Sequence, residues 1–305
     1  MDILIEGNTC TEEGIVKKYG QLQQGPEKGL FMDKGLIESY EKQLREAEKS
    51  SSTVEKYLRD LYRFNEYLNG GEVTKQSVIG WKHDLMARGY KPASINSMLA
   101  ALNSFLLYIG RSEMAAKNIR LQKRSYRSEY DELTKEEYFR LLNAAASDLR
   151  LQLMMQTICS TGIRVSELNY FTVEAAEAGE VTIACKGKMR TILIPNRLRE
   201  KLLAYSELHG ISSGAIFLTR KGSPVNRSNI WSGMKSLCAA ADVLPSKVYP
   251  HNLRKLFARE FYMQDKDLAK LADVLGHSNI ETTRIYIMGT GREHREQIER
   301  VDLML

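Results

Sequence analysis

One tyrosine near the end of the chain, Tyr286, follows a series of basic residues whose chemistry suits a phosphate group. In chain order these residues are Arg164, His251, Arg254 and His277. Phosphoryl transfer needs positive charge on the nonbridging oxygens, a proton donor for the leaving group and a nucleophile. Each residue alone is a weak signal, but together they indicate a tyrosine nucleophile aimed at a phosphodiester.

The local context of the two histidines supports this interpretation. His251 and Arg254 stand three residues apart on a helix predicted to begin after Pro250, so their side chains share one face. His277 follows a helix stop at Leu275–Gly276, in a loop that faces the next predicted helix. Taken singly, His251 and Arg254 would be interpreted as surface residues, and His277 as a helix cap or a core histidine.

Arg164 stands where a glycine-containing turn, residues 160–163, enters a short predicted helix. Its planar guanidinium can bind two phosphate oxygens, and the helix N-terminus adds free N–H donors and a positive dipole. The competing interpretation is an ion pair between Arg164 and Glu167.

Two short β-branched runs, residues 181–185 and 191–194, predict the strands of a hairpin. The segment that joins them carries Lys186 and Lys188, either of which could extend a proton donor toward a substrate. A hairpin lysine is usually only solubilising, and it is the conjunction with the other basic residues that favours the donor role.

Length and composition limit the class of protein. The 305 residues suffice for two domains with real cores, and the formal charge of +6 arises from 44 basic and 38 acidic residues. This balance fits a globular protein with local positive surfaces for nucleic acid rather than a histone-like tail.

The four cysteines have neither metal-ligand spacing nor the pattern of a disulfide scaffold, which favours a reducing compartment. The sequence shows no secretory leader and no apolar run near the roughly 18 residues that span a bilayer. We therefore expect a soluble, cytoplasmic protein without a membrane partner.

The first half of the chain predicts a leader, a domain and a linker. Glycines and weak periodicity make residues 1–33 an irregular leader, and residues 34–112 read as a compact domain of four helices. The second of these helices begins at Ser50–Thr53 and ends at Gly70–Gly71. In residues 113–130 basic side chains accumulate, which predicts a linker that is either solvated or laid along a DNA backbone.

The second domain, residues 131–305, opens with a capping box at Thr134–Glu137. It is predicted to be mostly helical, with a small antiparallel sheet formed by the hairpin and a third short strand at 215–218. Further helices are expected at 149–159, 195–209, 226–241, 251–263, 267–275, 280–287 and from about Glu293.

These motifs resemble the tyrosine recombinase family, the phage-integrase and Xer group. The matching stretches keep the family's order and spacing; they are 160–168, Lys186–Gly187, 251–254, 275–278 and 282–286. The helical region 36–110 is similar to the family's core-binding, SAM-like domain. The resemblance implies a mainly α fold with a small antiparallel β-sheet, in which this helical domain precedes the catalytic domain.

The resemblance also implies roles for the site residues. Tyr286 would attack the scissile phosphate, giving a 3′-phosphotyrosyl link and a free 5′-hydroxyl. Arg164 and Arg254 would hold the nonbridging oxygens, His277 would hydrogen-bond the phosphate, and His251 would serve proton transfer at the tyrosine. Because the phosphotyrosyl bond keeps the energy of the broken bond, no ATP is needed. The sequence shows no cluster of metal ligands, and no other cofactor is implied.

Lys186 would protonate the leaving oxygen, but two departures from the family's pattern appear. Residues 185–190 read Cys-Lys-Gly-Lys-Met-Arg where the family commonly has Gly-Lys-Gly, so Lys188 stays an alternative donor. Lys255 replaces the histidine that often follows the second arginine, which should matter little for the chemistry.

Candidate DNA contacts come from the first domain, the linker and the hairpin. They are Thr53, Lys117, Arg120, Lys123, Arg124, Lys188 and Arg190. The apolar tail, residues 289–305, either folds back on its own domain or, as in relatives, docks on a neighbouring subunit, and the Gly289–Gly291 hinge favours docking. Self-association as a tetramer on two DNA sites is then expected.

The function implied is site-specific DNA recombination, as an integrase or excisionase or as an Xer-like enzyme, through a Holliday junction. One alternative is a type IB-like topoisomerase that acts as a monomer, against which the tail and the domain pair argue. Another is a non-catalytic DNA-binding clamp, against which the complete set of reactive residues argues.

Overall fold

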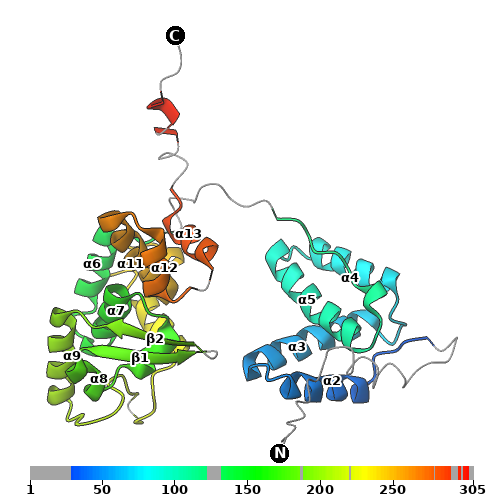
Figure 1. The fold of residues 1–305 in the computed structure, drawn as a ribbon, viewed down its shortest axis with the longest axis horizontal. Helices are drawn as coiled ribbons and strands as arrows, with labels where there is room; N and C mark the ends of the chain where they lie inside the picture. The colour runs from blue at the N-terminus through cyan, green and yellow to red at the C-terminus, as the bar shows by residue number, and fades with distance from the viewer. Residues whose placement is uncertain are drawn as a thin grey trace, which may run out of the picture. The chain divides into compact units, whose positions relative to one another are not determined.

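The computed structural model describes residues 29–121, 132–185, 188–219, 221–277, 279–289, 295–296 and 298–301, without the side chains of residues 184, 185 and 188. The chain divides into two compact units, Met1–Lys123 and Arg124–Leu305 (Figure 1). The predicted leader lies almost entirely outside the described residues. None of the described helices is both long and apolar enough to cross a membrane.

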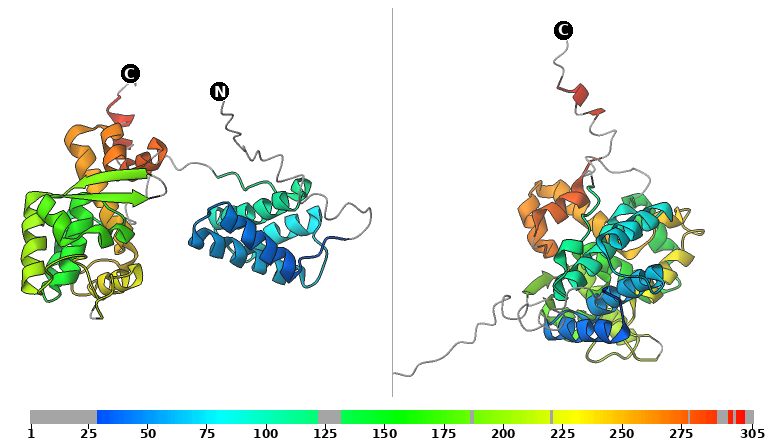
Figure 2. Two further views of the ribbon diagram at one scale, coloured as in Figure 1. Left: turned by 60° about the horizontal axis from the view of Figure 1, so that its bottom comes forward. Right: turned by 90° about the vertical axis from the view of Figure 1, so that its right-hand side faces the viewer.

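The first unit contains the four helices that the periodicity predicts (Figure 2). They are α2 (Lys34–Glu46), α3 (Ser51–Leu68), α4 (Lys75–Ala87) and α5 (Pro92–Tyr108), followed by a short 3₁₀ helix, η1 (Ser112–Met114). Their apolar faces meet around aromatic rings: the centroids of Tyr40 and Phe105 lie 5.3 Å apart, and those of Phe64 and Trp81 lie 5.1 Å apart. Burial of these rings supplies much of the packing energy that short helices lack alone.

Two predicted details of α3 differ in the structure. The helix ends at Leu68, and Asn69 follows it in the left-handed conformation with φ 47°. Asn69 stands one residue before the predicted glycine stop and takes its place, because asparagine also tolerates that conformation. Ser50 occupies the N-cap position, but its side chain makes no cap bond; its Oγ lies 2.8 Å from Oγ1 of Thr53.

The segment after η1 is bound to the first unit by two asparagines of α5. Asn103 exchanges hydrogen bonds with the backbone N–H and C=O of Ala116, at 3.1 and 3.0 Å. Asn96 does the same with Ile119, at 2.8 and 2.9 Å. The first part of the predicted linker is therefore pinned to a helix rather than free in solvent, whereas residues 122–131 lie outside the described residues.

The second unit is mostly helical, with one two-stranded antiparallel sheet among the described residues. Its helices are α6 (Lys135–Ala144), α7 (Leu149–Thr161), η3 (Val165–Tyr170), α8 (Val173–Ala178), α9 (Asn196–Leu208), α10 (Arg227–Ser236), η4 (Pro245–Lys247), α11 (Pro250–Asp265), α12 (Leu268–Leu275) and α13 (Ile280–Ile287). The strands are β1 (Glu180–Cys185) and β2 (Lys188–Leu193), next to α8 in Figure 1. The predicted fold class is confirmed.

The capping box at Thr134 and Glu137 is confirmed, with both reciprocal hydrogen bonds present. The predicted strand at 215–218 is wrong: in the described chain this segment makes only isolated bridges, Thr172 with Ala215 and Leu218 with Pro224. Ile216 and Phe217 are buried, so the apolar run that suggested a strand fills the core without building a ladder.

The packing of α7 against α11 forms the centre of this unit. The buried face of α7 includes Met155 and Ile158, both fully covered, and that of α11 includes Leu253 and Leu256. Since α7 leads into Arg164 and α11 carries His251 and Arg254, this helix pair brings the two halves of the predicted site together.

Candidate active site

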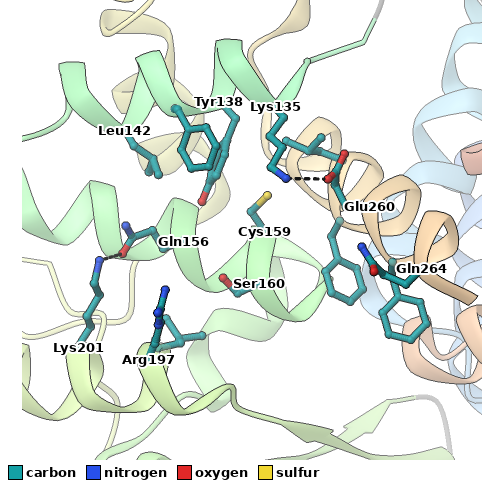
Figure 3. A pocket seen from close by; sticks show the side chains of 15 residues that line it. Lys135, Tyr138, Leu142, Gln156, Cys159, Ser160, Arg197, Lys201, Glu260 and Gln264 are labelled. Carbon is teal, nitrogen blue, oxygen red and sulfur yellow. Dashed lines mark hydrogen bonds and ion pairs between the residues drawn. The ribbon is translucent and has the colours of Figure 1, made fainter.

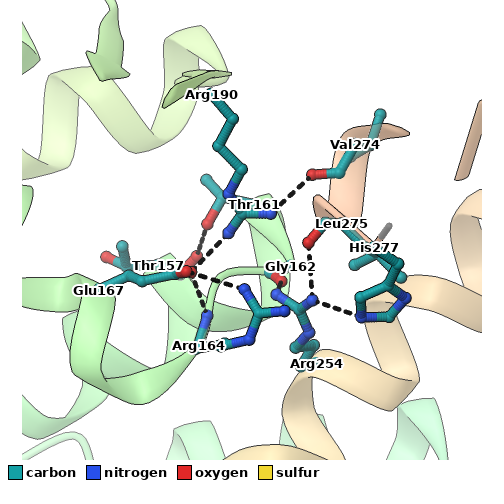
Figure 4. A network of polar contacts seen from close by, with 10 residues as sticks. All are labelled: Thr157, Thr161, Gly162, Arg164, Glu167, Arg190, Arg254, Val274, Leu275 and His277. Carbon is teal, nitrogen blue, oxygen red and sulfur yellow. Dashed lines mark hydrogen bonds and ion pairs between the residues drawn. The ribbon is translucent and has the colours of Figure 1, made fainter. Parts of the chain in front are cut away.

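Arg254 is a buried cation held by backbone carbonyls. Its side chain is 1% exposed; Nη1 donates to the carbonyl oxygen of Gly162, and Nη2 donates to that of Leu275 at 2.8 Å (Figure 4). Burial lowers the pKa of Arg254 to about 10, with the charge of Arg164 acting in the same direction and Tyr286 opposing it. The guanidinium therefore stays charged at neutral pH, and its position is set by the ends of α7 and α12.

Gly162 lets α7 end close enough to α11 for this contact. Its φ is +65°, the left-handed region that an L side chain rarely adopts. A Cβ atom there would lie 2.3 Å from Cδ1 of Phe257, well inside contact distance. Glycine at this position thus allows the carbonyl to reach Arg254 and the chain to turn into Arg164.

Glu167 is the shared partner of two arginines at the start of η3. Its buried carboxylate accepts hydrogen bonds from the backbone N–H of Arg164 at 2.7 Å, from Nη1 of Arg164 at 3.0 Å and from Nη2 of Arg190 at 2.5 Å. The ion pair between Arg164 and Glu167 is present, and it is compatible with the predicted binding of phosphate, because the side chain of Arg164 remains 43% exposed. The carboxylate orients the guanidinium while part of its surface stays accessible to an anion.

His277 lies between Arg254 and a buried hydroxyl. Nη2 of Arg254 lies 2.9 Å from Nε2 of the imidazole, and Oγ1 of Thr283 lies 2.9 Å from Nδ1. Since a guanidinium only donates, Nε2 must accept, and the ring proton is assigned to Nδ1, which donates to Thr283. Burial lowers the pKa of His277 to about 4, and the charges of Arg254, Arg164 and Arg190 add to this effect. His277 is therefore neutral at pH 7.

Tyr286 lies on α13 with its ring edge-on to both histidines. The centroid of its ring is 5.3 Å from that of His251, at an interplanar angle of 78°, and 5.3 Å from that of His277, at 70°. The tyrosine is 6% exposed and packs in a small apolar cluster with side chains of α11 and α12. Its ring is thus fixed in place beside two nitrogen bases.

His251 begins α11 next to several positive charges. Partial burial of its ring lowers its pKa to about 4 although the residue keeps an exposed surface, and the charges of Lys255, Arg254, Arg227 and Arg164 contribute. An imidazole with such a pKa is neutral at pH 7 and can accept a proton from a phenol.

The structure brings together five of the predicted catalytic residues, from four separate segments of the second unit. They are Arg164, His251, Arg254, His277 and Tyr286. Lys186 lies outside the described residues, so its role stays a prediction. Lys188 pairs with Cys185 at the start of β2, but its side chain is not described.

The candidate DNA contacts are distributed differently. Lys117 and Arg120 are exposed on the first unit, Thr53 is half-buried, and Lys123 and Arg124 fall outside the described residues. Arg190 does not point to solvent: its side chain is 17% exposed and lies against Glu167, contrary to the DNA contact predicted for it. The alternation of side chains along a strand places Arg190 on the same face as Ile192, and this local pattern could have indicated that it is turned inward.

Sequence reasoning missed the role of Thr283 and weighed Glu167 only as a competitor for Arg164. The spacing could have indicated the role of Thr283, because it stands three residues before Tyr286 on one predicted helix and so shares its face. The structure shows that both residues are buried. The partnership of Glu167 with Arg190, 23 residues later, has no such local signature.

Comparison with known proteins identifies the family of this chain. The profile of the Phage integrase family matches residues 131–291, and that of the phage integrase N-terminal SAM-like domain matches residues 37–112. Tyrosine recombinase XerA of Pyrococcus furiosus is 29% identical over 279 residues, which cover 88% of this chain and 94% of the relative.

Two solved structures show the same fold. A lambda integrase dimer bound to a COC′ core site matches with a TM-score of 0.69 at 20% identity, over 85% of this chain and 96% of that one. A lambda integrase tetramer bound to a Holliday junction matches with a TM-score of 0.64 at 19% identity, over 83% and 76%. Fold, site and profile together define a tyrosine recombinase, and the chain belongs to the phage integrase family.

Proposed function

We propose that this chain is a site-specific DNA recombinase that cleaves and rejoins strands through Tyr286. The observation that carries the proposal is the position of this tyrosine, buried edge-on against two neutral imidazoles and close to the charged Arg254. A phenol in this place has a base for its proton and a cation for the charge that develops on the phosphate.

The step is a transesterification. Oη of Tyr286 attacks the scissile phosphorus, the new O–P bond forms, and the bond from phosphorus to the 5′-oxygen breaks. The phenol proton passes to His251, and the leaving 5′-oxygen takes a proton from a lysine, for which the family resemblance suggests Lys186. The phosphotyrosyl bond conserves the energy of the broken bond, so rejoining reverses the same step without ATP.

The arginines supply the electrostatic part of the reaction. The accessible guanidinium of Arg164 and the buried guanidinium of Arg254 would bind the nonbridging oxygens, where negative charge accumulates in the transition state. Both are oriented before DNA arrives, Arg164 by Glu167 and Arg254 by two carbonyl oxygens. Because Arg254 is 1% exposed, it would have to be uncovered before a phosphate oxygen could reach it.

We further propose that the recombinase works as a tetramer on two DNA sites in the cytoplasm, like the lambda integrase tetramer on a Holliday junction. The first unit, with the exposed Lys117 and Arg120, would bind the DNA backbone, and Lys123 and Arg124 stay candidates for this role from the sequence. The tail from about residue 289 would join neighbouring subunits.

A candidate receiver for the tail is a cavity of about 530 Å³ on the second unit, between α6, α7, α9 and α11 (Figure 3). Its lining is largely apolar and includes Phe139, Phe257 and Phe261. In the tail, Ile298 and Val301 are 71% and 60% exposed, so these side chains are not covered by their own unit. We assign the tail of a second copy as the occupant, because its apolar side chains match the lining.

A pair of substitutions tests this assembly. Val301→Asp in the tail and Phe139→Asp in the cavity should each weaken assembly on paired sites while binding of one protomer to a half-site is kept. The double variant should be no worse than either single one, because both remove the same contact. Leu208→Asp, at a 70% exposed leucine outside the cavity, is the control. Equal loss of half-site binding would contradict the docking.

The chemistry is tested with nicked duplexes that carry candidate sites, since a nick lets the cleaved end diffuse away and traps the covalent adduct. We expect an adduct with the wild-type protein and with Tyr262→Phe, and none with Tyr286→Phe. An adduct that survives in Tyr286→Phe, or one linked through a 5′-phosphate, would refute the mechanism.

A further inference from the structure

We propose that Arg190 is a positioning residue for this reaction, resting on the function proposed above: it sets Arg164 through Glu167 and sets the turn that presents His277. The side chain reaches from β2 to the start of η3 and to the end of α12 (Figure 4). It therefore joins the three segments around the anion site without itself being a candidate to bind the phosphate.

The strand register explains why this arginine faces inward. Arg190 pairs with Ile183 across the hairpin, and residues directly opposite in an antiparallel pair lie on the same face. Ile183 is 1% exposed, and Ile192, on the same face of β2, is 5% exposed. Arg190 thus occupies a core position, where a charged side chain persists only with a partner.

That partner is Glu167. Nη2 of Arg190 lies 2.5 Å from Oε2 of the carboxylate, whose other oxygen, Oε1, accepts from Nη1 of Arg164 at 3.0 Å. One carboxylate is therefore held between two guanidinium groups. Removing Arg190 would leave Glu167 held only by the backbone N–H and Nη1 of Arg164, so the carboxylate could shift and Arg164 would lose the geometry in which it meets the phosphate.

The second arm of Arg190 acts on the turn before His277. Nη1 donates to the carbonyl oxygen of Val274 at 3.3 Å, and the side chain lies on the backbone of Gly276. A Cβ at Gly276 would be 2.6 Å from both Cδ and Nη1 of Arg190, and the residue has a φ of +65°. This glycine makes room for the arginine one residue before the imidazole.

The test compares Arg190→Gln with Arg199→Gln, a matched control on α9 whose guanidinium also bonds backbone carbonyls, those of Ala176 and Glu177. Single-turnover cleavage is measured on a normal scissile phosphate and on a methylphosphonate, which lacks one nonbridging charge. A variant that misplaces Arg164 should cleave the normal phosphate more slowly and the methylphosphonate nearly normally, because only the phosphate carries the charge that Arg164 would stabilise.

We expect Arg190→Gln to cleave the phosphate on the order of 10- to 100-fold more slowly, as is typical when a supporting residue is lost. The defect should shrink to within about threefold on the methylphosphonate, and Arg199→Gln should match wild type on both. Equal loss on both substrates overturns the proposal. Rescue of Arg190→Gln by a 5′-bridging phosphorothiolate alone would also overturn the proposal, because it would place the defect at the leaving group. Loss of DNA binding with normal cleavage at saturating protein would overturn it as well.

Two measurements keep the test independent of how well this variant folds and of the proposed chemistry. Gly276→Ala retains the charge of Arg190 but displaces its side chain, and the same preference for the methylphosphonate is expected. Gly179→Ala, which carries the same left-handed strain with nothing within 4 Å of its Cβ, is its control and should cleave like wild type. NMR titration of His277 requires no cleavage: the pKa of His277 should rise in Arg190→Gln and stay unchanged in Arg199→Gln. An unchanged pKa of His277 in Arg190→Gln overturns the proposal, whether or not the wild-type protein forms a covalent adduct. The absence of an adduct with the wild-type protein would by itself refute only the proposed function.

Discussion

Nη2 of Arg254 lies 2.9 Å from Nε2 of His277, and this contact sets the protonation of the imidazole. The ring must accept at Nε2 and carry its proton on Nδ1, facing Thr283 at 2.9 Å. To donate from Nε2 to a bound phosphate, as the family resemblance implies, His277 would have to move its proton from Nδ1 to Nε2. A hydroxyl both donates and accepts, so Thr283 can serve either tautomer.

The first prediction concerns this hydroxyl. Thr283→Val removes the partner of Nδ1 at a fully buried position, and one lost hydrogen bond is worth about 1 kcal/mol. Single-turnover cleavage of a nicked substrate should slow by about fivefold, since 1.4 kcal/mol corresponds to a factor of ten. Thr282→Val, at the exposed neighbouring position, is the control. Wild-type cleavage by Thr283→Val would show that the hydroxyl does not orient His277.

The second prediction concerns pH and stability. Folding lowers the pKa of His251 and of His277 from 6.5 to about 4, mainly through burial. Between these values the unfolded chain binds more protons than the folded one, so the free energy of unfolding should fall as the pH drops from about 6.5 to 4. Above 6.5 this contribution is fully present. Denaturant unfolding at several pH values measures it.

The variant His251→Gln/His277→Gln should lose less stability than wild type over the same pH interval, because it lacks both titrating groups. Identical pH dependence of the two proteins would mean that these imidazoles are not desolvated in the folded state.

The third prediction concerns the close approach of α7 and α11. Gly162→Ala forces a left-handed alanine, which costs about 1–2 kcal/mol, and presses a methyl group into Phe257, for which overpacking adds about 1–3 kcal/mol. Gly179→Ala is the matched control, since its φ is +78° but its Cβ would meet nothing within 4 Å. Thermal unfolding should show a clearly larger loss for Gly162→Ala; equal losses would remove the steric argument.

The fourth prediction concerns the segment bound to α5. Amide hydrogen exchange of Ile119 should accelerate in Asn96→Ala, and that of Ala116 in Asn103→Ala, because each asparagine oxygen is the acceptor of that amide. Each variant serves as the control for the other amide, and Asn118→Ala, at an exposed position, should change neither. Slow exchange of Ile119 in Asn96→Ala would mean that other contacts hold the segment.

Much of the fold could be predicted because its signals are local. The spacing of apolar residues gave the helices to within a few residues, as at Lys75–Ala87, and the capping box at Thr134 placed the start of α6. The strand predicted at 215–218 failed because Ile216 and Phe217 are buried, and burial alone does not distinguish a strand from an irregular core segment.

The amino-acid sequence by itself determined which reactive groups exist, in which order they occur and on which local elements they stand: Tyr286, two arginines and two histidines near helix ends. Only the tertiary structure decided how they meet. Arg254 reaches the carbonyl of Gly162, 92 residues away in the chain, and Arg190 turns inward to share Glu167 with Arg164. Periodicity and caps report on neighbours within a few residues, whereas these contacts depend on the packing of α7, α11, α12 and the hairpin around one buried site.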